Sequence, residues 1–314
     1  MKTAVMFSGQ GTQYPGMMRD IVEEYAGARE LFDMASELMG RDMFALTMNS
    51  SQEDLDQTKN TQPCLLTCEL AALRAVRENG LQYDAALGFS LGEWTALAAS
   101  GAAEERDVLR VIDLRADAMQ RAVPPGEGGM AAILGKDVGF VLQLCQMVGD
   151  IAPANYNCPG NITVAGTAAA VERFMEEAAR QGITAVRVAI SIPSHCTLMS
   201  PAADELVPAI ERLRLFVPRT ELVMNATGKP AIDRTEIKQN LIRQLMQPVL
   251  FQQSIEYLLE NGYEAFIEIG PGKSLSGMVK RTAKQSGKRV KIMQICDLSS
   301  MRTVCEECRG FSDK

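Results

Sequence analysis

Apolar positions along the chain follow two alternating patterns, and together they predict an α/β fold. Short apolar runs are typical of buried strands, whereas apolar residues spaced three or four apart are typical of helices that pack on one face. The runs predict strands at 3–7, 83–87, 130–134, 152–157, 162–165, 185–190 and 265–269. The helical pattern covers 63–79, 95–100, 103–123, 138–148 and 168–181, and one helix that ends at Glu24. Because strands alternate with helices, we expect a parallel sheet covered by helices.

Between residues 128 and 192 the order of the predicted elements changes to strand, helix, strand, strand, helix, strand. This is the order of a ferredoxin-like unit. The Pro124-Pro125-Gly126 segment precedes it and Pro193 follows it, so both ends have the composition of a hinge. We therefore expect a large domain made of 1–126 and 193–314, with a small subdomain inserted at 127–192.

Composition narrows the class of protein. The 314 residues are 46% hydrophobic and 23% charged, as in an ordinary globular protein. A net charge of −7 argues against nucleic-acid binding, which needs a basic surface. No apolar stretch approaches the length of a membrane span, and the N-terminus lacks the pattern of a signal peptide. We expect a cytoplasmic protein that binds neither nucleic acid nor membrane.

Eight cysteines raise the question of disulfides or a metal site. In a long cytosolic chain, free buried thiols are the better interpretation. Cys305 and Cys308 have the spacing of half a zinc site, but no second pair has matching spacing. We expect this pair to lie in a frayed tail with neither a redox nor a metal role.

The Gly88-Phe89-Ser90-Leu91-Gly92 segment carries the strongest chemical signal. It matches the Gly-x-Ser-x-Gly elbow, in which a strand turns sharply into a helix and exposes a serine. Glycines are required there because the tight turn leaves no room for β-carbons. Ser90 is therefore a candidate nucleophile, and the alternative is a serine that merely occupies a tight turn.

A serine hydroxyl needs a general base, most often histidine, to become a good nucleophile. The chain contains one histidine, His195, which follows the predicted strand 185–190. It is therefore the only histidine available to activate Ser90. A lone histidine is also frequently structural, and that alternative stays open at this point.

Six motifs in register resemble one family, the malonyl-CoA:acyl-carrier-protein transacylases of bacterial fatty-acid synthesis. The motifs are Phe7-Ser8-Gly9-Gln10-Gly11-Thr12-Gln13, Thr61-Gln62-Pro63, Gly88-Phe89-Ser90-Leu91-Gly92-Glu93, Asn155-Tyr156-Asn157-Cys158-Pro159-Gly160, Pro193-Ser194-His195-Cys196 and Glu268-Ile269-Gly270-Pro271-Gly272-Lys273. The resemblance covers most of the chain. It implies an α/β-hydrolase-like core with a parallel sheet, an inserted ferredoxin-like subdomain, and acyl-carrier-protein S-malonyltransferase activity.

The resemblance also implies roles for individual residues. Ser90 attacks the malonyl thioester and His195 removes its proton, so that a malonyl-serine forms and reacts in a ping-pong scheme. The backbone N–H groups of Gln10 and Leu91 form the oxyanion hole. The backbone carbonyl of Gln244 orients the histidine, although the sequence alone does not favour it over a carboxylate. The glycines around Gln10 are equally compatible with a plain turn.

The family resemblance assigns substrate selectivity to Arg115. This residue matches the family arginine that pairs with the malonyl carboxylate. A guanidinium grips a carboxylate with two hydrogen bonds and so discriminates malonyl from acetyl. The alternative is a surface arginine paired with an acid on its own helix. Malonyl is favoured over methylmalonyl, but not exclusively. Phe89 is a departure, because the family usually has histidine there, and we hypothesise altered acyl selectivity or rate.

The implied partners are malonyl-CoA and an acidic acyl carrier protein, and the resemblance implies no cofactor and no metal. Residues 271–291 contain seven basic and no acidic residues, so we expect the carrier to dock near Lys280, Arg281 and Lys284. A solvated helix face is the alternative. We expect a monomer. Competing functions are a trans-acting acyltransferase of a polyketide synthase, a serine thioesterase or hydrolase, and a non-catalytic binding protein.

Overall fold

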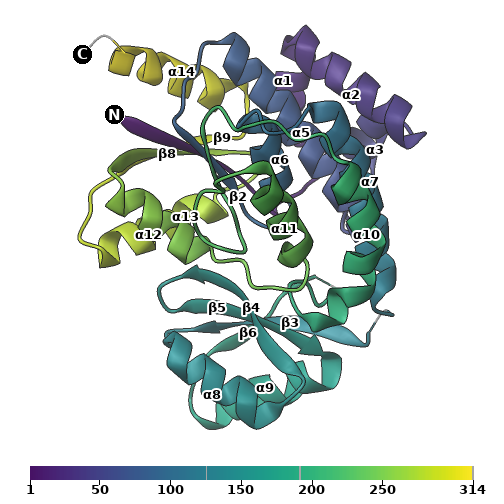
Figure 1. Ribbon diagram of the computed structural model, residues 1–314, viewed down its shortest axis with the longest axis vertical. Coiled ribbons are helices and arrows are strands. Elements are labelled where there is room, and N and C mark those ends of the chain that lie inside the picture. Colours follow the sequence, from purple (N-terminus) through teal and green to yellow (C-terminus); the bar gives the residue numbers. More distant parts are fainter. Residues whose placement is uncertain (125, 191, 313–314) are drawn as a thin grey trace.

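The chain folds around two separate β-sheets (Figure 1). The computed structural model describes residues 1–124, 126–190 and 192–312, and their side chains up to residue 309. Pro125 of the expected hinge and Ser191 near the end of the expected insertion lie outside the described residues. Within the described part, none of the helices is both long enough and apolar enough to cross a lipid bilayer.

The large sheet has five strands in the order β7-β2-β1-β8-β9, and every neighbouring pair is parallel. The strands are β1 (Lys2–Phe7), β2 (Ala85–Gly88), β7 (Glu221–Val223), β8 (Tyr263–Ile269) and β9 (Lys291–Ile295). Along β1, Val5 and Phe7 pack into one hydrophobic cluster, while Ala4 and Met6 pack into another. Both faces of the sheet are therefore buried, which explains the uninterrupted apolar runs of its strands.

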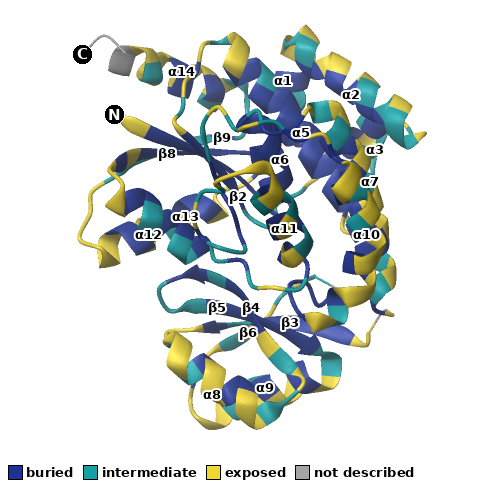
Figure 2. Cartoon of the chain, viewed as in Figure 1, coloured by how far each residue is buried: buried dark blue, intermediate teal, exposed yellow. Residues whose placement is uncertain are grey.

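Helices cover both faces of this sheet (Figure 1). The larger layer consists of α1 (Arg19–Glu24), α2 (Ala26–Met39), α3 (Met43–Asn49), α4 (Gln52–Leu55), α5 (Thr58–Glu78), α6 (Gly92–Ala99), α7 (Glu105–Ala122), a 3₁₀ turn (Thr197–Met199), α10 (Ser200–Arg212), α11 (Arg234–Gln244) and α14 (Leu298–Ser312). The opposite face is covered by α12 (Phe251–Glu260) and α13 (Ser274–Gln285). Figure 2 shows the sheet strands dark, whereas outer helices such as α2 alternate between buried and exposed positions. Every residue of α6 is buried, so this helix lies at the centre of the fold.

The second sheet is antiparallel, with strand order β4-β5-β3-β6. Its elements are β3 (Gly128–Leu134), α8 (Val138–Val148), β4 (Ile151–Cys158), β5 (Asn161–Thr167), α9 (Ala168–Arg180) and β6 (Ala185–Arg187). The two helices pack on one face through a cluster of their own. The order of elements and the strand order are those of a ferredoxin-like unit, so the expected fold class is confirmed. The exact residue limits of the two domains stay a prediction.

The helix expected to end at Glu24 is confirmed as α1, which begins at Arg19 because Gly16 and Met18 adopt positive φ angles that no helix contains. Two local expectations need correction. The helix expected from residue 63 begins at Thr58 and includes Pro63. A proline there leaves the carbonyl of residue 59 without its helical donor, and Arg41 Nη2 donates to that carbonyl instead. The strand expected over 185–190 is shorter, as β6 ends at residue 187.

The interpretation of the tail was also wrong. Cys305 and Cys308 lie in α14, and the Cys305 side chain is buried in the core with Met301 and Val304. All eight cysteines are free thiols. No group of three or more metal-ligating side chains occurs among the described residues. The tail is therefore an ordered amphipathic helix that closes one end of the large domain.

Candidate active site

The elbow at Ser90 joins the end of β2 to the start of α6. Ser90 has φ +53°, a left-handed conformation that is strained for a residue with a β-carbon. A β-carbon on Gly88 would lie 1.9 Å from the carbonyl carbon of Gly92, and one on Gly92 would lie 2.1 Å from the carbonyl oxygen of Phe7. Only glycine fits at either position, so the strand, the turn and the helix pack as one rigid unit beneath the serine.

Asn225 holds the elbow from the neighbouring strand end, just after β7. Its Nδ2 donates to the carbonyl of Gly88 at 2.6 Å, and its Oδ1 accepts from the Ser90 N–H at 2.8 Å. Its own N–H donates to Oε1 of Glu93 at 2.5 Å. Because the Ser90 N–H is used in this way, it does not point toward a substrate. Sequence reasoning missed Asn225, because the strand before it, β7, was not expected and its contact with the elbow is long-range.

His195 lies directly over the serine. Its Nε2 is 2.7 Å from Ser90 Oγ, and its Nδ1 is 2.7 Å from the backbone carbonyl of Gln244. A carbonyl only accepts, so Nδ1 carries the hydrogen and Nε2 is free to accept the serine proton. Gln244 is the last residue of α11, and helix-end carbonyls lack an intrahelical donor, which is why this one is available.

The protonation state of His195 follows from its surroundings. The imidazole is 2% exposed, and burial, helped by the positive charge of Arg115, lowers its pKa to about 4 despite the bond to Gln244. The ring is therefore neutral over the whole neutral pH range. A neutral imidazole with its lone pair on a serine hydroxyl is a general base ready to accept a proton.

Arg115 of α7 is buried beside the serine and is only 1% exposed. Its Nη1 donates to Oε1 of Gln62 at 2.5 Å, and its Nη2 donates to Oε1 of Gln244 at 3.1 Å and lies 3.4 Å from Ser90 Oγ. Burial lowers its pKa to about 10, partly offset by Glu93, so it remains charged at neutral pH. The arginine is not a surface residue, and both of its close partners are neutral amides. It presents an unneutralised positive charge to the site.

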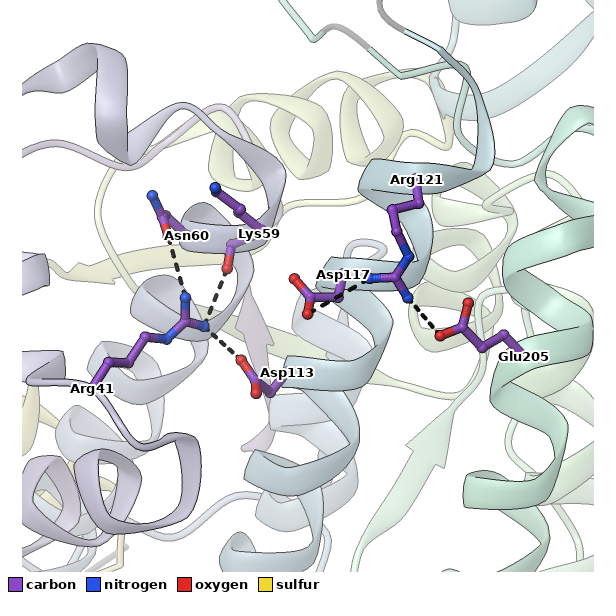
Figure 3. Close-up of polar contacts among 7 residues, drawn as sticks. All are labelled: Arg41, Lys59, Asn60, Asp113, Asp117, Arg121 and Glu205. Carbon is purple, nitrogen blue, oxygen red and sulfur yellow. Dashed lines mark hydrogen bonds and ion pairs between the residues drawn. The ribbon is translucent and has the colours of Figure 1, made fainter.

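Ion pairs on the outer side of α7 fix the helix that carries Arg115 (Figure 3). Arg41 Nη2 contacts Asp113 Oδ1 at 2.5 Å, and Arg121 Nη2 contacts Glu205 Oε1 of α10 at 2.6 Å. Asp113 precedes Arg115 by two residues, so the two side chains leave the helix on nearly opposite sides. The Arg41–Asp113 pair is half-buried, whereas the Arg121–Glu205 pair is exposed, and an exposed pair contributes only about 0–1 kcal/mol. Their main effect is to hold α7 against the neighbouring helices.

Two backbone N–H groups near the serine have no hydrogen-bond acceptor. Gln10 follows β1 in the Gly9–Gly11 loop, and Leu91 is the residue before the first turn of α6. Across the described residues, neither amide donates a hydrogen bond. The loop approaches the elbow closely, because a β-carbon on Gly9 would lie 2.7 Å from the carbonyl oxygen of Phe89. Two unused donors therefore flank the serine.

These groups surround a pocket at the junction of the two sheets. The residues that line it are Gln10, Gln62, Phe89, Ser90, Leu91, Arg115, Met119, Met130, Asn155, Ile190, Ser194 and His195. The large domain supplies the nucleophile, the two free amides and the guanidinium. The small sheet closes the other side with Met130 of β3 and Asn155 of β4.

A family model described as an acyl transferase domain matches residues 5–303. The malonyl CoA-acyl carrier protein transacylase of Bacillus subtilis is 36% identical over 99% of both chains, and that of Escherichia coli K12 is 38% identical over 88% of this chain and 92% of its own length. This chain belongs to the malonyl CoA-acyl carrier protein transacylase family.

Solved structures of the family superpose closely on this chain. A Vibrio cholerae acyl carrier protein S-malonyltransferase, 37% identical, matches with a TM-score of 0.92 over 97% of this chain and 100% of its own. A malonyl-transacylase solved in complex with a type II polyketide synthase acyl-carrier protein, 34% identical, matches with a TM-score of 0.93 over 98% of this chain and 100% of its own. The resemblance inferred from the six motifs is thus confirmed, and with it the membership of an acyltransferase family.

Two buried carboxyl groups lie behind this transacylase site. Glu93 accepts from the Asn225 N–H and from Gln244 Nε2, the latter at 2.6 Å. Burial raises the pKa of Glu93 to about 8, against the lowering effects of these donors and of Arg115. Gln244 Nε2 also donates to the Ser90 carbonyl at 2.8 Å. One glutamine therefore joins the elbow, the guanidinium and the histidine.

The second carboxyl group, Glu69 of α5, connects the elbow helix to the N-terminal loop. Its Oε1 accepts from Ser8 Oγ at 2.7 Å and its Oε2 accepts from Thr95 Oγ1 at 2.6 Å. Thr12 Oγ1 in turn lies 3.3 Å from Ser8 Oγ and donates to the Gly9 carbonyl at 3.1 Å. Burial raises the pKa of Glu69 to about 8. The residue joins the two segments that carry the free amides.

Phe89, where the family usually has histidine, lies in the pocket wall. Its ring packs edge-on against Phe251 of α12, with 5.7 Å between centroids. The wall is therefore apolar at this point.

All six site residues named from the sequence meet within this site. The roles of Glu69, Glu93 and Asn225 were missed, although Glu93 ends the elbow motif, because each contacts other protein groups rather than the reacting atoms. Gln62 was quoted in a motif, but its contact with Arg115 was not inferred. The signal available for it was a polar residue among the apolar residues of one helix face.

Proposed function

We propose that this chain transfers a malonyl group from malonyl-CoA to the phosphopantetheine thiol of an acyl carrier protein, through a malonyl-Ser90 intermediate. One observation carries the proposal: a neutral His195 and a charged, buried Arg115 both approach Ser90 Oγ, at 2.7 and 3.4 Å. The first activates an acyl-transfer nucleophile. The second suits an acyl group that itself bears a carboxylate.

In the first half-reaction, Ser90 Oγ attacks the thioester carbonyl carbon while its proton moves to Nε2 of His195. The carbonyl oxygen becomes an oxyanion that accepts hydrogen bonds from the N–H groups of Gln10 and Leu91. The carbon–sulfur bond then breaks, the proton on Nε2 passes to the departing CoA sulfur, and malonyl-Ser90 remains. Gln244 keeps the ring in the required tautomer throughout.

In the second half-reaction, the carrier thiol gives its proton to Nε2 of His195 as its sulfur attacks the ester carbonyl. The same two amides stabilise the second oxyanion. The bond between the carbonyl carbon and Ser90 Oγ breaks, and the oxygen takes the proton back from His195. Serine and histidine return to their starting states, as ping-pong kinetics require.

Arg115 selects the acyl group in this proposal. Gln62 and Gln244 hold two of its nitrogens, which fixes the plane of the guanidinium before substrate arrives. A bidentate bond to the malonyl carboxylate discriminates against acetyl-CoA, which has no such group. The grip on the carboxylate also favours a malonyl transferase over a general serine hydrolase.

Docking of the carrier is proposed at α13, whose Lys280, Arg281 and Lys284 are all exposed. An acidic carrier is attracted to such a surface, with an effect that salt weakens. Lys280→Glu combined with Lys284→Glu should raise the KM for the carrier about tenfold at low salt. Arg281 is left unchanged because its charge also acts on the nearby Cys158 thiol, where it lowers the pKa against the larger raising effect of burial. The matched control is Lys59→Glu on α5, and an unchanged carrier KM in the double variant would favour a merely solvated helix.

Intact mass measurement tests the central proposal. Incubation with malonyl-CoA should add one malonyl group to the protein, and Ser90→Ala should remove the adduct. Adding a carrier protein that bears phosphopantetheine should discharge the adduct onto the carrier. Release of free malonate at the same rate without carrier would instead identify a hydrolase, and absence of any adduct would refute covalent catalysis.

A carrier of polyketide synthesis is the second candidate acceptor. The observation that favours it is the 34% identical malonyl-transacylase, whose solved complex contains a type II polyketide synthase carrier. Comparing the two carriers as acceptors at equal concentration separates the fatty-acid role from the polyketide role.

We further propose that no metal or dissociable cofactor takes part, since the chain itself supplies nucleophile, base, oxyanion donors and cation. Dialysis against EDTA should leave the transfer rate unchanged. We also propose a cytoplasmic location, which cell fractionation tests.

A further inference from the structure

Asn155 is a buried polar residue of the pocket that none of the proposed steps uses. It is only 8% exposed, and it lines the pocket together with Ser90 and His195. Its Oδ1 is fully buried without a partner, and over the described residues its carboxamide makes no hydrogen bond. Asn157, two residues further along β4, also has a buried Oδ1 without a partner, but its Nδ2 donates to Asn161 and Thr163, and it is not among the residues that line the pocket.

The backbone around Asn155 is fixed on both sides. β4 has a register irregularity between Pro153 and Asn155, and Asn155 pairs with Thr163 of β5. On the other edge it bridges to Val249, with the Tyr156 N–H donating to the Val249 carbonyl at 2.9 Å. The small sheet is thus tied to the large domain at the residue that carries the orphan carboxamide. These backbone bonds fix the point from which the carboxamide projects.

A buried polar group without a partner is unfavourable, and native proteins keep such groups chiefly where a ligand or ordered water completes them. An oxygen acceptor such as Oδ1 needs a donor. The malonyl thioester offers none, because its carboxylate, carbonyl and sulfur only accept. Moving outward from the reacting sulfur, the first donor is the amide N–H of the pantetheine arm, two carbons beyond the sulfur.

We propose that the Asn155 carboxamide binds this first amide of the pantetheine arm, an inference that rests on the function proposed above. Oδ1 accepts the amide N–H, and Nδ2 is placed to donate to the amide carbonyl, so the two amides match donor to acceptor. CoA and the carrier bear the same arm. Asn155 therefore contributes to both half-reactions, and it recognises the part of the substrate that does not change.

Three malonyl donors test the proposal: malonyl-CoA, malonyl-N-acetylcysteamine, which keeps only the first amide, and the malonyl thioester of propanethiol, which has none. The measured quantity is kcat/KM for malonyl-Ser90 formation in the wild type and in Asn155→Leu. We expect a loss of about tenfold with the two amide donors, the size of one or two buried hydrogen bonds. The propanethiol ester should change less than about twofold, since the variant removes a contact that this donor never makes.

Leaving-group differences cancel, because each donor is compared with itself across variants. Asn157→Ala is the matched control: it removes an asparagine of the same strand outside the pocket and should lower thermal stability without depending on the donor. A smaller variant, Asn155→Ala, should reproduce the donor-dependent pattern of Asn155→Leu.

Two outcomes would overturn the inference. An equal loss on all three donors would place Asn155 against the malonyl group or in the fold, and no loss on any donor would leave water as its partner. Failure of the wild type to acylate Ser90 with every donor is a different result, because it refutes the proposed function itself.

Discussion

The charge on Arg115 makes the sharpest prediction about selectivity. We expect Arg115→Met, which keeps an unbranched side chain of similar length, to lower kcat/KM for malonyl-CoA by about a thousandfold. The magnitude follows from Coulomb's law: unit charges about 4 Å apart at an effective dielectric constant of about 20 attract by about 4 kcal/mol, which corresponds to about three powers of ten. Acetyl-CoA lacks the carboxylate, so its already slow reaction should change little.

Arg115→Lys refines the test. An ammonium keeps the charge but cannot bond Gln62, Gln244 and a carboxylate in one plane, so we expect an intermediate loss of about 10- to 100-fold. The assay is rapid-quench formation of acyl-Ser90 with each acyl-CoA, followed by intact mass. The matched control is Arg121→Met on the same helix, which loses only two exposed ion pairs, with Asp117 and Glu205, and should change either rate less than about twofold.

A parallel loss with malonyl- and acetyl-CoA would refute the reasoning. Arg115 would then act on Ser90 Oγ, from which its Nη2 is 3.4 Å, or on the fold, rather than on the substrate carboxylate. Retention of the malonyl preference in Arg115→Met would refute it equally.

Three further predictions concern pH, a buried carboxyl group and the pocket wall. Because burial lowers the pKa of His195 from 6.5 to about 4, kcat/KM should stay flat through neutral pH and fall only in acid; a limb near pH 6.5 would contradict the burial argument. The same shift makes the free energy of unfolding depend on pH: the contribution of neutral His195 is fully present above pH 6.5 and is lost as pH falls toward 4, by up to about 3 kcal/mol. Denaturant titration should find this pH dependence reduced in His195→Gln. Glu69→Leu breaks the link between the N-terminal loop and α6, so kcat should fall about 10- to 100-fold with little change in KM, and Glu69→Gln should restore part of it; a change confined to the thermal midpoint would show a purely structural role. Phe89→His makes the wall polar, so methylmalonyl-CoA should lose about fivefold relative to malonyl-CoA; competition between the two thioesters measures this, and an unchanged ratio would remove Phe89 from the selectivity argument.

Local patterns in the sequence predicted the parts of the fold that depend on neighbours in the chain. The apolar runs located all four strands of the small sheet and three of the five in the large sheet, but not the edge strands β7 and β9. The glycine spacing located the elbow, because tight turns are short-range properties. Pairing Ser90 with His195 needed only the fact that the chain has one histidine. These inferences did not require knowledge of how distant segments pack.

The parts that escaped prediction depend on long-range contacts or on overlooked periodicity. Asn225 reaches the elbow across more than a hundred residues, and no local pattern reports such a contact. Glu69 sits on a helix whose polar residues gave no hint of a partner. The tail was a different case, since Met301, Cys305 and Cys308 recur at helical spacing and predict a buried face.

The hydrogen bond from His195 to the Gln244 carbonyl has a consequence for the kind of substrate the site tolerates. A carboxylate in that position would add a full negative charge beside the place where a malonate anion must settle. The end of an eleven-residue helix offers instead the fractional negative potential of its aligned peptides, enough to stabilise an imidazolium that exists only in passing. Glu93, the nearest buried acid, favours its neutral form at neutral pH because burial raises its pKa to about 8. The cleft thus carries a net positive potential at rest, and an anion meets far less repulsion from the group that orients the base than a carboxylate would cause.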